Sequence, residues 1–246
     1  PSALQLAGGR NRMTPAKPKR TAPDVSTRVT AAVDGDVPRR LRAERERRHM
    51  SVRELARRLQ LSPSAISQIE RGIARPSVAT LYAIVTELGL SLDELFAHRS
   101  DSHDQRSSAG SAAVAPPEHN WPVVAQSDRV GIELRTGVRW ERLTADPDPE
   151  VDFLYVVYEV GGSSSPDDTL MRHPGREYGL VLSGKLEVTV QFDTYVLEAG
   201  DSISFDSTIP HRLRNIGDEP MIGVWIVIGR RAALTVEPNS ARTPVD

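Results

Sequence analysis

The spacing of apolar residues changes once along the chain, and this change predicts two domains of different class. Between residues 38 and 96, large apolar residues recur every three or four positions, which is typical of packed amphipathic helices. After residue 130 they alternate with polar residues in short runs, which is typical of β-strands. Residues 98–119 are rich in Ser, Ala, Asp and Pro, and this composition predicts a flexible linker.

The remaining segments are assigned from the same patterns. Residues 1–36 are rich in Ala, Thr, Pro, Gly and Arg and show no apolar periodicity, which indicates disorder. We therefore expect a disordered basic tail (1–36), a helical domain (37–98), a flexible linker (99–118), a β domain (119–236) and a C-terminal tail (237–246).

Helix start signals divide the helical domain. Serines that can cap a helix stand before four of its segments: Ser51, Ser62, Ser77 and Ser91. Glu54 follows Ser51 by three residues and completes a capping box. Pro63 occupies the first position after Ser62, where a missing N–H costs little. Together with the segment that begins near Pro38, these signals predict five short helices in an all-α domain.

The second half of the chain contains many short β-rich runs separated by Gly, Pro, Asp and Ser. These runs are residues 130–137, 153–160, 177–183, 185–192, 194–200, 201–206, 211–217 and 221–229. Many short strands without intervening helices predict an all-β sandwich or barrel.

The charge of the chain is distributed unevenly. The first 99 residues contain 18 Arg and Lys but 10 Asp and Glu, a net charge of +8, whereas residues 100–246 carry a net charge of −10. This asymmetry indicates that only the helical half contacts a polyanion.

The absence of cysteine limits the chemistry of any site. Disulfides and thiolate metal sites are excluded, so a metal would have to be held by His, Asp or Glu. The sequence shows neither a secretory signal nor an apolar run near the ~20 residues of a membrane helix, so we expect a cytoplasmic protein.

Residues 38–97 carry a resemblance to a known family. The pieces ELA, LSPSAISQIERG and RPSVATL resemble the helix-turn-helix domain of the phage-repressor-like (XRE, Cro/C1) transcriptional regulators. The resemblance implies binding to double-stranded DNA, with the helix that follows Ser62 lying in the major groove.

The resemblance also implies which residues contact DNA. The groove-facing positions are occupied by Ser62, Pro63, Ser64, Ala65 and Gln68, and the candidates for phosphate contacts are Arg42, Ser51, Arg53, Arg71 and Arg75. Gln68 is the best candidate for reading a base, because its amide can form two hydrogen bonds with adenine.

The β domain resembles a second family, the cupins, whose fold is a double-stranded β-helix barrel. The matching segments are HPGREYGLVLSGKLEVTV and LEAGDSISFDSTIPHRLRNIG. His173, Glu177 and Gly184 match the first cupin motif, while Met171 stands where that motif has its first histidine. Gly200, His211 and Asn215 match the second motif. The resemblance implies an effector pocket that contains Met171, His173, Glu177 and His211.

A metal ion is one possible occupant of this pocket. His173, Glu177 and His211 would provide two imidazoles and one carboxylate, the set that holds Fe(II) in many non-haem enzymes and also suits Mn, Ni or Zn. Met171, on the same side of the strand as His173, is a poor ligand for hard cations. The other possibility is a metal-free pocket in which these side chains bind an organic ligand.

The two domains together are consistent with two functions. One is a transcriptional regulator, not an enzyme, whose cupin domain senses a small molecule or metal. The other is a mononuclear non-haem iron oxygenase such as the epoxidase that makes fosfomycin, which has the same plan. We favour the regulator, because Ser64 and Gln68 keep the residue types of a base-reading helix. We also expect a homodimer in contact through the β domain, since one recognition helix reads few bases.

Overall fold

A computed structural model of the chain describes residues 37–96, 123–146, 148, 150–166 and 169–229. The tail, linker and C-terminal segment predicted for residues 1–36, 99–118 and 237–246 lie outside these ranges. Within them, no helix has the length and apolar character needed to span a membrane.

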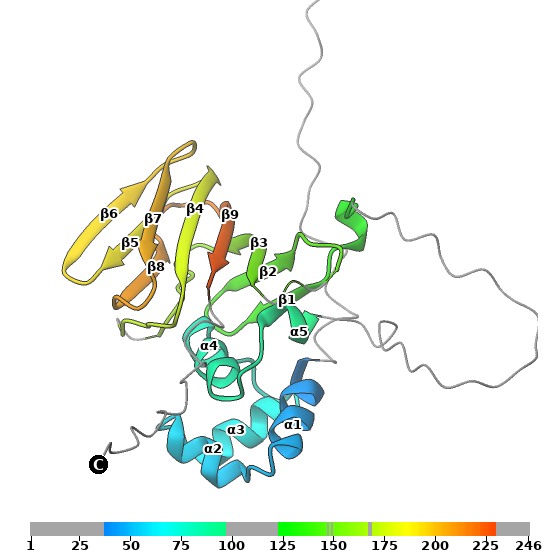
Figure 1. Cartoon of the computed structure of the whole chain (residues 1–246). Coiled ribbons are helices and arrows are strands. Elements are labelled where there is room, and N and C mark those ends of the chain that lie inside the picture. The colour runs from blue at the N-terminus through cyan, green and yellow to red at the C-terminus, as the bar shows by residue number, and fades with distance from the viewer. Residues whose placement is uncertain (1–36, 97–122, 147, 149, 167–168, 230–246) are drawn as a thin grey trace, which may run out of the picture.

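The first described part is helical (Figure 1). Its helices are α1 (Val37–Arg47), α2 (Val52–Arg58), α3 (Pro63–Glu70), α4 (Val78–Glu87) and α5 (Leu92–Phe96). The Oγ atoms of Ser51, Ser62 and Ser77 accept the backbone N–H three residues later, each at 3.1 Å. The predicted starts of α2, α3 and α4 are thereby confirmed.

A buried ion pair fixes helix α3 against α1. The guanidinium of Arg45 donates to both carboxylate oxygens of Glu70, at 2.6 and 2.9 Å, and its third nitrogen donates to the carbonyl of Met50 at 2.6 Å. Both side chains are more than 90% buried. Such bidentate pairs set direction as well as distance, so the orientation of α3 is well defined.

The second described part is all-β. After the 3-10 helix η2 (Gln126–Asp128), its strands are β1 (Gly131–Leu134), β2 (Val138–Arg142), β3 (Val151–Tyr158), β4 (Arg176–Ser183), β5 (Leu186–Val190), β6 (Asp193–Leu197), β7 (Ser202–Asp206), β8 (His211–Asn215) and β9 (Met221–Ile228). They form an antiparallel sheet of order β1-β2-β3-β9-β4-β7 and a second sheet of order β6-β5-β8.

Two features differ from the sequence prediction. Strand β2 was missed, because its sequence VRWER offers only Val138 and Trp140 as apolar positions among three charged residues. The expected closed barrel is not formed by the described strands, which lie in two separately bonded sheets. Isolated bridges of Met171 with His211 and of Ser163 with Arg214 tie the loops beside the large sheet to β8.

The helical and β parts share one continuous core. Buried apolar residues of both parts belong to a single cluster, which includes Leu55 and Leu81 in the helices and Leu154 and Val188 in the sheets. Figure 1 shows α4 between the strands and helices α2 and α3, and the backbone N–H of Ala79 in α4 donates to the carbonyl of Ser164 in the β domain at 3.0 Å. Helix α4 therefore joins the two domains.

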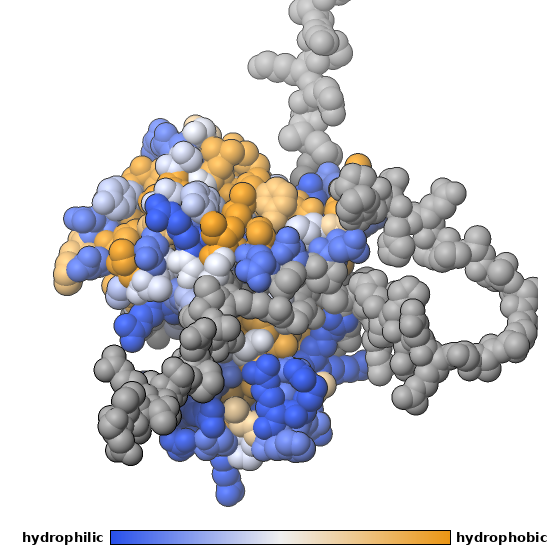
Figure 2. All heavy atoms as spheres, in the orientation of Figure 1, coloured by the Kyte–Doolittle hydropathy of each residue, from blue (hydrophilic) through white to orange (hydrophobic). Residues whose placement is uncertain are grey.

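The two parts also differ in the character of their surface. In Figure 2 hydrophilic side chains cover the helices, whereas apolar side chains gather over the sheets.

Candidate metal centre and recognition helix

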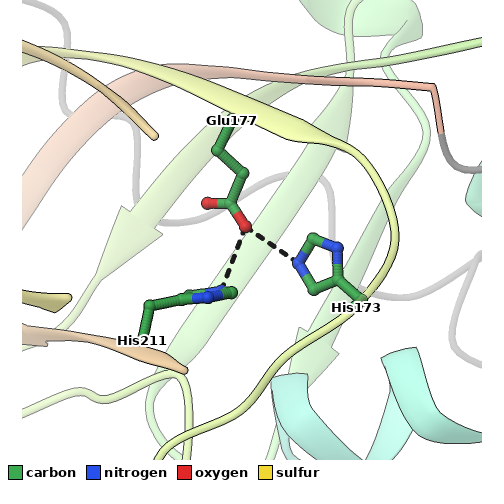
Figure 3. Close-up of side chains that lie close together, drawn as sticks. All are labelled: His173, Glu177 and His211. Atoms are coloured by element: carbon green, nitrogen blue, oxygen red, sulfur yellow. Dashed lines mark ion pairs between the residues drawn. The ribbon is translucent and has the colours of Figure 1, made fainter. Parts of the chain in front are cut away.

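Three titratable side chains meet between the two sheets of the β domain (Figure 3). Glu177 lies on β4, His211 begins β8, and His173 lies in the loop before β4. The Nε2 atoms of His173 and His211 lie 2.8 and 3.1 Å from the same carboxylate oxygen, Oε1 of Glu177. All three residues are buried, and one ligand atom from each lies within 4.8 Å of the others.

The other ring nitrogen of each histidine fixes its tautomer. Nδ1 of His173 lies 3.1 Å from the carbonyl of Pro174, and Nδ1 of His211 lies 2.8 Å from the carbonyl of Ile209. Because a carbonyl only accepts, Nδ1 donates in both rings. In the neutral form, each Nε2 therefore directs a lone pair toward Glu177.

This arrangement needs a positive charge between the nitrogens and the carboxylate. Two lone pairs facing a carboxylate oxygen repel it, so either protons on Nε2 or a cation must separate them. Nε2 of His173 lies 2.8 Å from Oε1 of Glu177, but the geometry of this contact is not that of a hydrogen bond. This buried nitrogen has no hydrogen-bond partner among the described residues. The donor set of two imidazoles and a carboxylate therefore fits a divalent metal ion.

The electrostatics keep Glu177 ionised. Burial alone would raise the pKa of the Glu177 carboxyl, but the adjacent imidazoles of His173 and His211 outweigh it, so this pKa lies below its usual value. Burial lowers the pKa of His211, while the adjacent Glu177 raises it by more, so the net shift is upward. Glu177 is thus a carboxylate, available as a ligand or acceptor.

A tryptophan that the sequence reasoning missed holds the second oxygen of Glu177. Nε1 of Trp225, on β9, donates to Oε2 at 2.7 Å. The indole passes over Gly179 of β4, where a Cβ atom would lie 2.1 Å from the ring. The inward alternation of β9 signals a buried Trp225, but its partner follows only from the register of β4 against β9, which pairs Gly179 with Trp225.

Met171 lies beside this cluster without belonging to the ligand set. Its backbone exchanges two hydrogen bonds of 2.8 Å with His211, and its buried side chain lines the adjacent pocket. Arg172, the next residue, is exposed.

The pocket next to the cluster is mainly apolar and aromatic. It has about 300 Å³ of empty space, including its mouth, and its β-domain lining includes Trp140, Leu154, Tyr158 and Trp225. No Lys or Arg of the described residues lines it. Helix α4 completes the wall with two side chains, Val78 and Tyr82, which the sequence reasoning treated only as part of the helical domain.

The residues predicted to contact DNA lie on α2, α3 and the segment after α3. Ser51, Arg53, Ser62, Pro63, Ser64, Gln68, Arg71 and Arg75 are exposed, and Ala65 is half-buried. Arg71 donates to the carbonyl of Ser67 at 3.1 Å. The guanidinium of Arg75 lies 3.8 Å from the carboxylate of Glu133 in the β domain, while its side chain stays 53% exposed. Arg42 pairs with Glu46 on the exposed side of α1 at 2.8 Å.

Comparison with known families agrees with this architecture. A family model described as helix-turn-helix matches residues 41–95, and one described as cupin domain matches residues 154–227. The chain is therefore a helix-turn-helix protein with a cupin domain.

Individual relatives align over most of the chain. The HTH-type transcriptional regulator PuuR of Escherichia coli (strain K12) is 27% identical over 178 residues, which are 72% of this chain and 86% of PuuR. The HTH-type transcriptional regulator SutR of the same organism is 22% identical and covers 73% of this chain and 86% of its own length. A crystal structure of an HTH_3 family transcriptional regulator from Vibrio cholerae aligns with a TM-score of 0.54 at 20% identity, over 80% of this chain and 97% of that one. At this identity, the alignment shows that the fold is shared.

Proposed function

We propose that this chain is a sequence-specific DNA-binding transcriptional regulator whose cupin domain binds a small-molecule or metal effector. The observation that carries the proposal is the exposed, well-anchored helix α3. Its groove-facing side chains are solvent-accessible, while Glu70 at its end is clamped by Arg45 of α1. A helix held rigidly with a polar face outward is suited to reading base edges. The regulator names of PuuR and SutR support it.

The individual contacts follow from the residue types. Gln68 would bond an adenine through its amide, Ser64 would bond either kind of base, and Ala65 would contact a thymine methyl. Ser51, Arg53 and Arg71 would bind phosphates and so position α3 without specifying sequence. The exposed guanidinium of Arg75 would do the same beside Glu133.

The cupin pocket would hold the effector. Its apolar lining favours a small, largely apolar molecule. His173, Glu177 and His211 would hold a divalent metal where one binds, and that metal would supply a Lewis-acidic anchor for a donor atom of the effector.

One observation favours a second function, a non-haem iron oxygenase. A centre with two histidines and one carboxylate leaves coordination positions open for oxygen and substrate, as such enzymes need. Oxygen consumption by the Fe(II)-loaded chain, abolished by His211→Ala, would establish the enzyme, whereas DNA binding modulated by a pocket ligand would establish the regulator.

The regulator would act as a homodimer. The face of the large sheet that points away from the pocket carries apolar side chains on three adjacent strands: Phe153 of β3, Val224 and Ile226 of β9, and Tyr178, Leu180 and Leu182 of β4. We refer to these six residues as the outer apolar face. The three β4 side chains are 40–48% exposed, and Figure 2 shows apolar atoms gathered in this region. A second copy on this face would pair two recognition helices across a two-fold axis.

The test of DNA binding compares two substitutions on the full chain. Gln68→Ala should lose about 1–3 kcal/mol of binding to DNA from upstream of its own gene, with little change in salt dependence. Arg53→Ala should weaken binding to specific and random duplexes alike and reduce the salt slope by about one. If Gln68→Ala bound the upstream DNA as tightly as the wild type, α3 would not be the reading helix.

A further inference from the structure

Helix α4 of the DNA-binding domain forms part of the candidate effector pocket. Tyr82 is only 5% exposed, and its ring stacks on the ring of His173 with centroids 4.1 Å apart and an interplanar angle of 12°. The same ring meets Trp140 edge-on, with centroids 5.5 Å apart. A residue of the helical domain is thus in direct contact with a candidate metal ligand and with a pocket wall.

Backbone contacts attach the start of α4 to the rim of the same pocket. The N–H of Ala79 donates to the carbonyl of Ser164 at 3.0 Å, and the Oγ of Ser164 accepts the N–H of Leu213 at 3.0 Å. Ser164 and Leu213 both line the pocket. The N–H of Arg135 also donates to the carbonyl of Pro76, immediately before α4, at 2.9 Å. A displacement of the pocket rim would therefore also displace the first turn of α4.

The other side of α4 contacts α2, which in turn packs against α3. Leu81 and Ile84 of α4 are buried in the apolar cluster that also includes Leu55 of α2 and Ile66 of α3. The carboxylate of Glu87, at the end of α4, pairs with Arg58 of α2 at 2.8 Å. Because packed helices move as units, a displacement of α4 carries α2 and α3 with it.

The close stacking leaves no room between Tyr82 and His173. Ring centroids 4.1 Å apart are in van der Waals contact, so a ligand that reaches the histidine from the pocket must take up a position against Tyr82 or displace it. We infer that Tyr82 and Val78 are ligand-contacting residues of the effector site, and that occupancy of the pocket changes DNA binding through them by moving α4. This inference rests on the proposed regulator function and assigns a route for its regulation.

The test uses the full chain with Zn(II) or Ni(II) alone as the pocket probe. The affinity for DNA from upstream of its own gene is measured with and without saturating metal, and metal binding is followed by calorimetry. In the wild type, metal should change DNA affinity by about 5- to 150-fold, the usual range for coupled sites. In Tyr82→Leu, which removes the flat ring but keeps much of its bulk, the ratio should fall to within about twofold of one.

Two variants serve as controls. Tyr82→Phe keeps the stacking ring and should keep the wild-type ratio. Tyr195→Leu replaces an exposed aromatic residue on β6, away from the pocket, and should also keep it. Because the ratio is formed within each variant, a change in DNA affinity that is the same with and without metal does not alter it.

Hydrogen exchange of residues 78–87 provides a readout that requires no DNA. Metal should change the protection of α4 in the wild type and in Tyr82→Phe but not in Tyr82→Leu. Equal ratios in the wild type and Tyr82→Leu, or a wild-type ratio of one with metal bound, would overturn the inference. If the wild type gave no metal-binding heat, both the inference and the metal site would be overturned. If the wild type did not bind DNA but metal still changed the hydrogen exchange of α4, the proposed regulator function would be overturned instead.

Discussion

At the scale of single residues, the direction of each donor around Glu177 determines what the site can bind. Trp225 donates to one carboxylate oxygen, and the two Nε2 atoms approach the other. Since Trp225 occupies Oε2 only, Oε1 is left for a cation that the histidines share. Trp225 is therefore a positioning residue for Glu177.

Trp225→Phe should weaken metal binding without unfolding the protein. Phenylalanine fills most of the indole space but leaves Oε2 of Glu177 without its buried donor, so the carboxylate is free to rotate. Loss of an outer hydrogen bond to a ligand typically lowers metal affinity about 10- to 100-fold. Calorimetric titration with Ni(II) or Zn(II) measures this change, and an unaltered affinity would show that Glu177 is held by other contacts.

Metal affinity should also fall as the pH falls. Glu177 raises the pKa of His211 above its ordinary value of 6.5 in the metal-free protein, so the protonated form persists to higher pH than in a free histidine. A metal must displace that proton, which gives about a tenfold loss of affinity per pH unit below the raised pKa and a plateau above it. The stability of the metal-free protein should change in the opposite direction. The pair of protonated His211 with Glu177 stabilises the fold at low pH, and this contribution is lost as the pH rises through the raised pKa.

Calorimetric titrations between pH 5.5 and 8.5 measure the metal affinity, and urea denaturation of the metal-free protein over the same range measures its stability. A pH-independent affinity would exclude a histidine ligand.

The sequence was informative about the site only where the signal was local. His173, Glu177 and His211 could be proposed as ligands from short motifs whose spacing follows the chain. Trp225 and Tyr82 could not be placed in the same way, because their contacts depend on the β4–β9 register and on the docking of α4. Hydrophobic patterning predicts that such residues are buried, but it does not identify their partners.

At the scale of elements, capping residues account for the accuracy of the helix boundaries. Ser51, Ser62 and Ser77 bond backbone groups within their own first turn, so the start of each helix is decided within four residues. Strand β2 lacks an equivalent signal, since Arg139 and Glu141 pair with each other at 2.6 Å on the side opposite its apolar residues. Sheet closure likewise depends on distant strands, and it was the part of the β fold that local patterns did not predict.

Glu70→Gln should destabilise the helical domain strongly. The substitution removes the bidentate, buried partner of the Arg45 guanidinium and leaves it only the half-exposed carboxylate of Glu46, 3.5 Å away. Breaking one half of a buried pair typically costs about 3–5 kcal/mol. Urea denaturation followed by circular dichroism measures the loss. Glu198→Gln is the control, since Glu198 forms an exposed ion pair with Lys185 at 2.8 Å, away from Arg45, and its loss should cost far less than that of Glu70. Similar small effects for both would mean that Arg45 does not anchor α3.

At the scale of the whole molecule, the sequence predicts two independently folded domains, whereas the structure has one apolar core that continues from the helices into the sheets. The composition of the predicted linker suggested domains without a fixed contact, but α4 is buried against the β domain and shares its cluster. The sequence shows α4 only as an amphipathic helix with several large apolar residues on more than one side. Apolar residues on more than one side of a helix indicate a second contact surface, and Val78 and Tyr82 are indeed buried together with Leu81 and Ile84.

Leu180→Lys should convert a dimer into a monomer while leaving the fold intact. Leu180 lies in the middle of the outer apolar face, beside Val224 of β9, and is 40% exposed in the single chain, so a lysine there can extend into water. In a dimer formed through this face, the ammonium would be buried without a partner. A cost of about 3 kcal/mol would weaken association by about 100-fold. Sedimentation of both proteins at micromolar concentration measures the change, with Val196→Lys on the exposed edge strand β6 as the control that keeps the dimer. DNA binding should weaken in parallel, because the second recognition helix is no longer linked to the first. A variant that still sedimented as a dimer would place the interface elsewhere, and a monomeric wild type that bound its upstream DNA tightly would contradict paired half-sites.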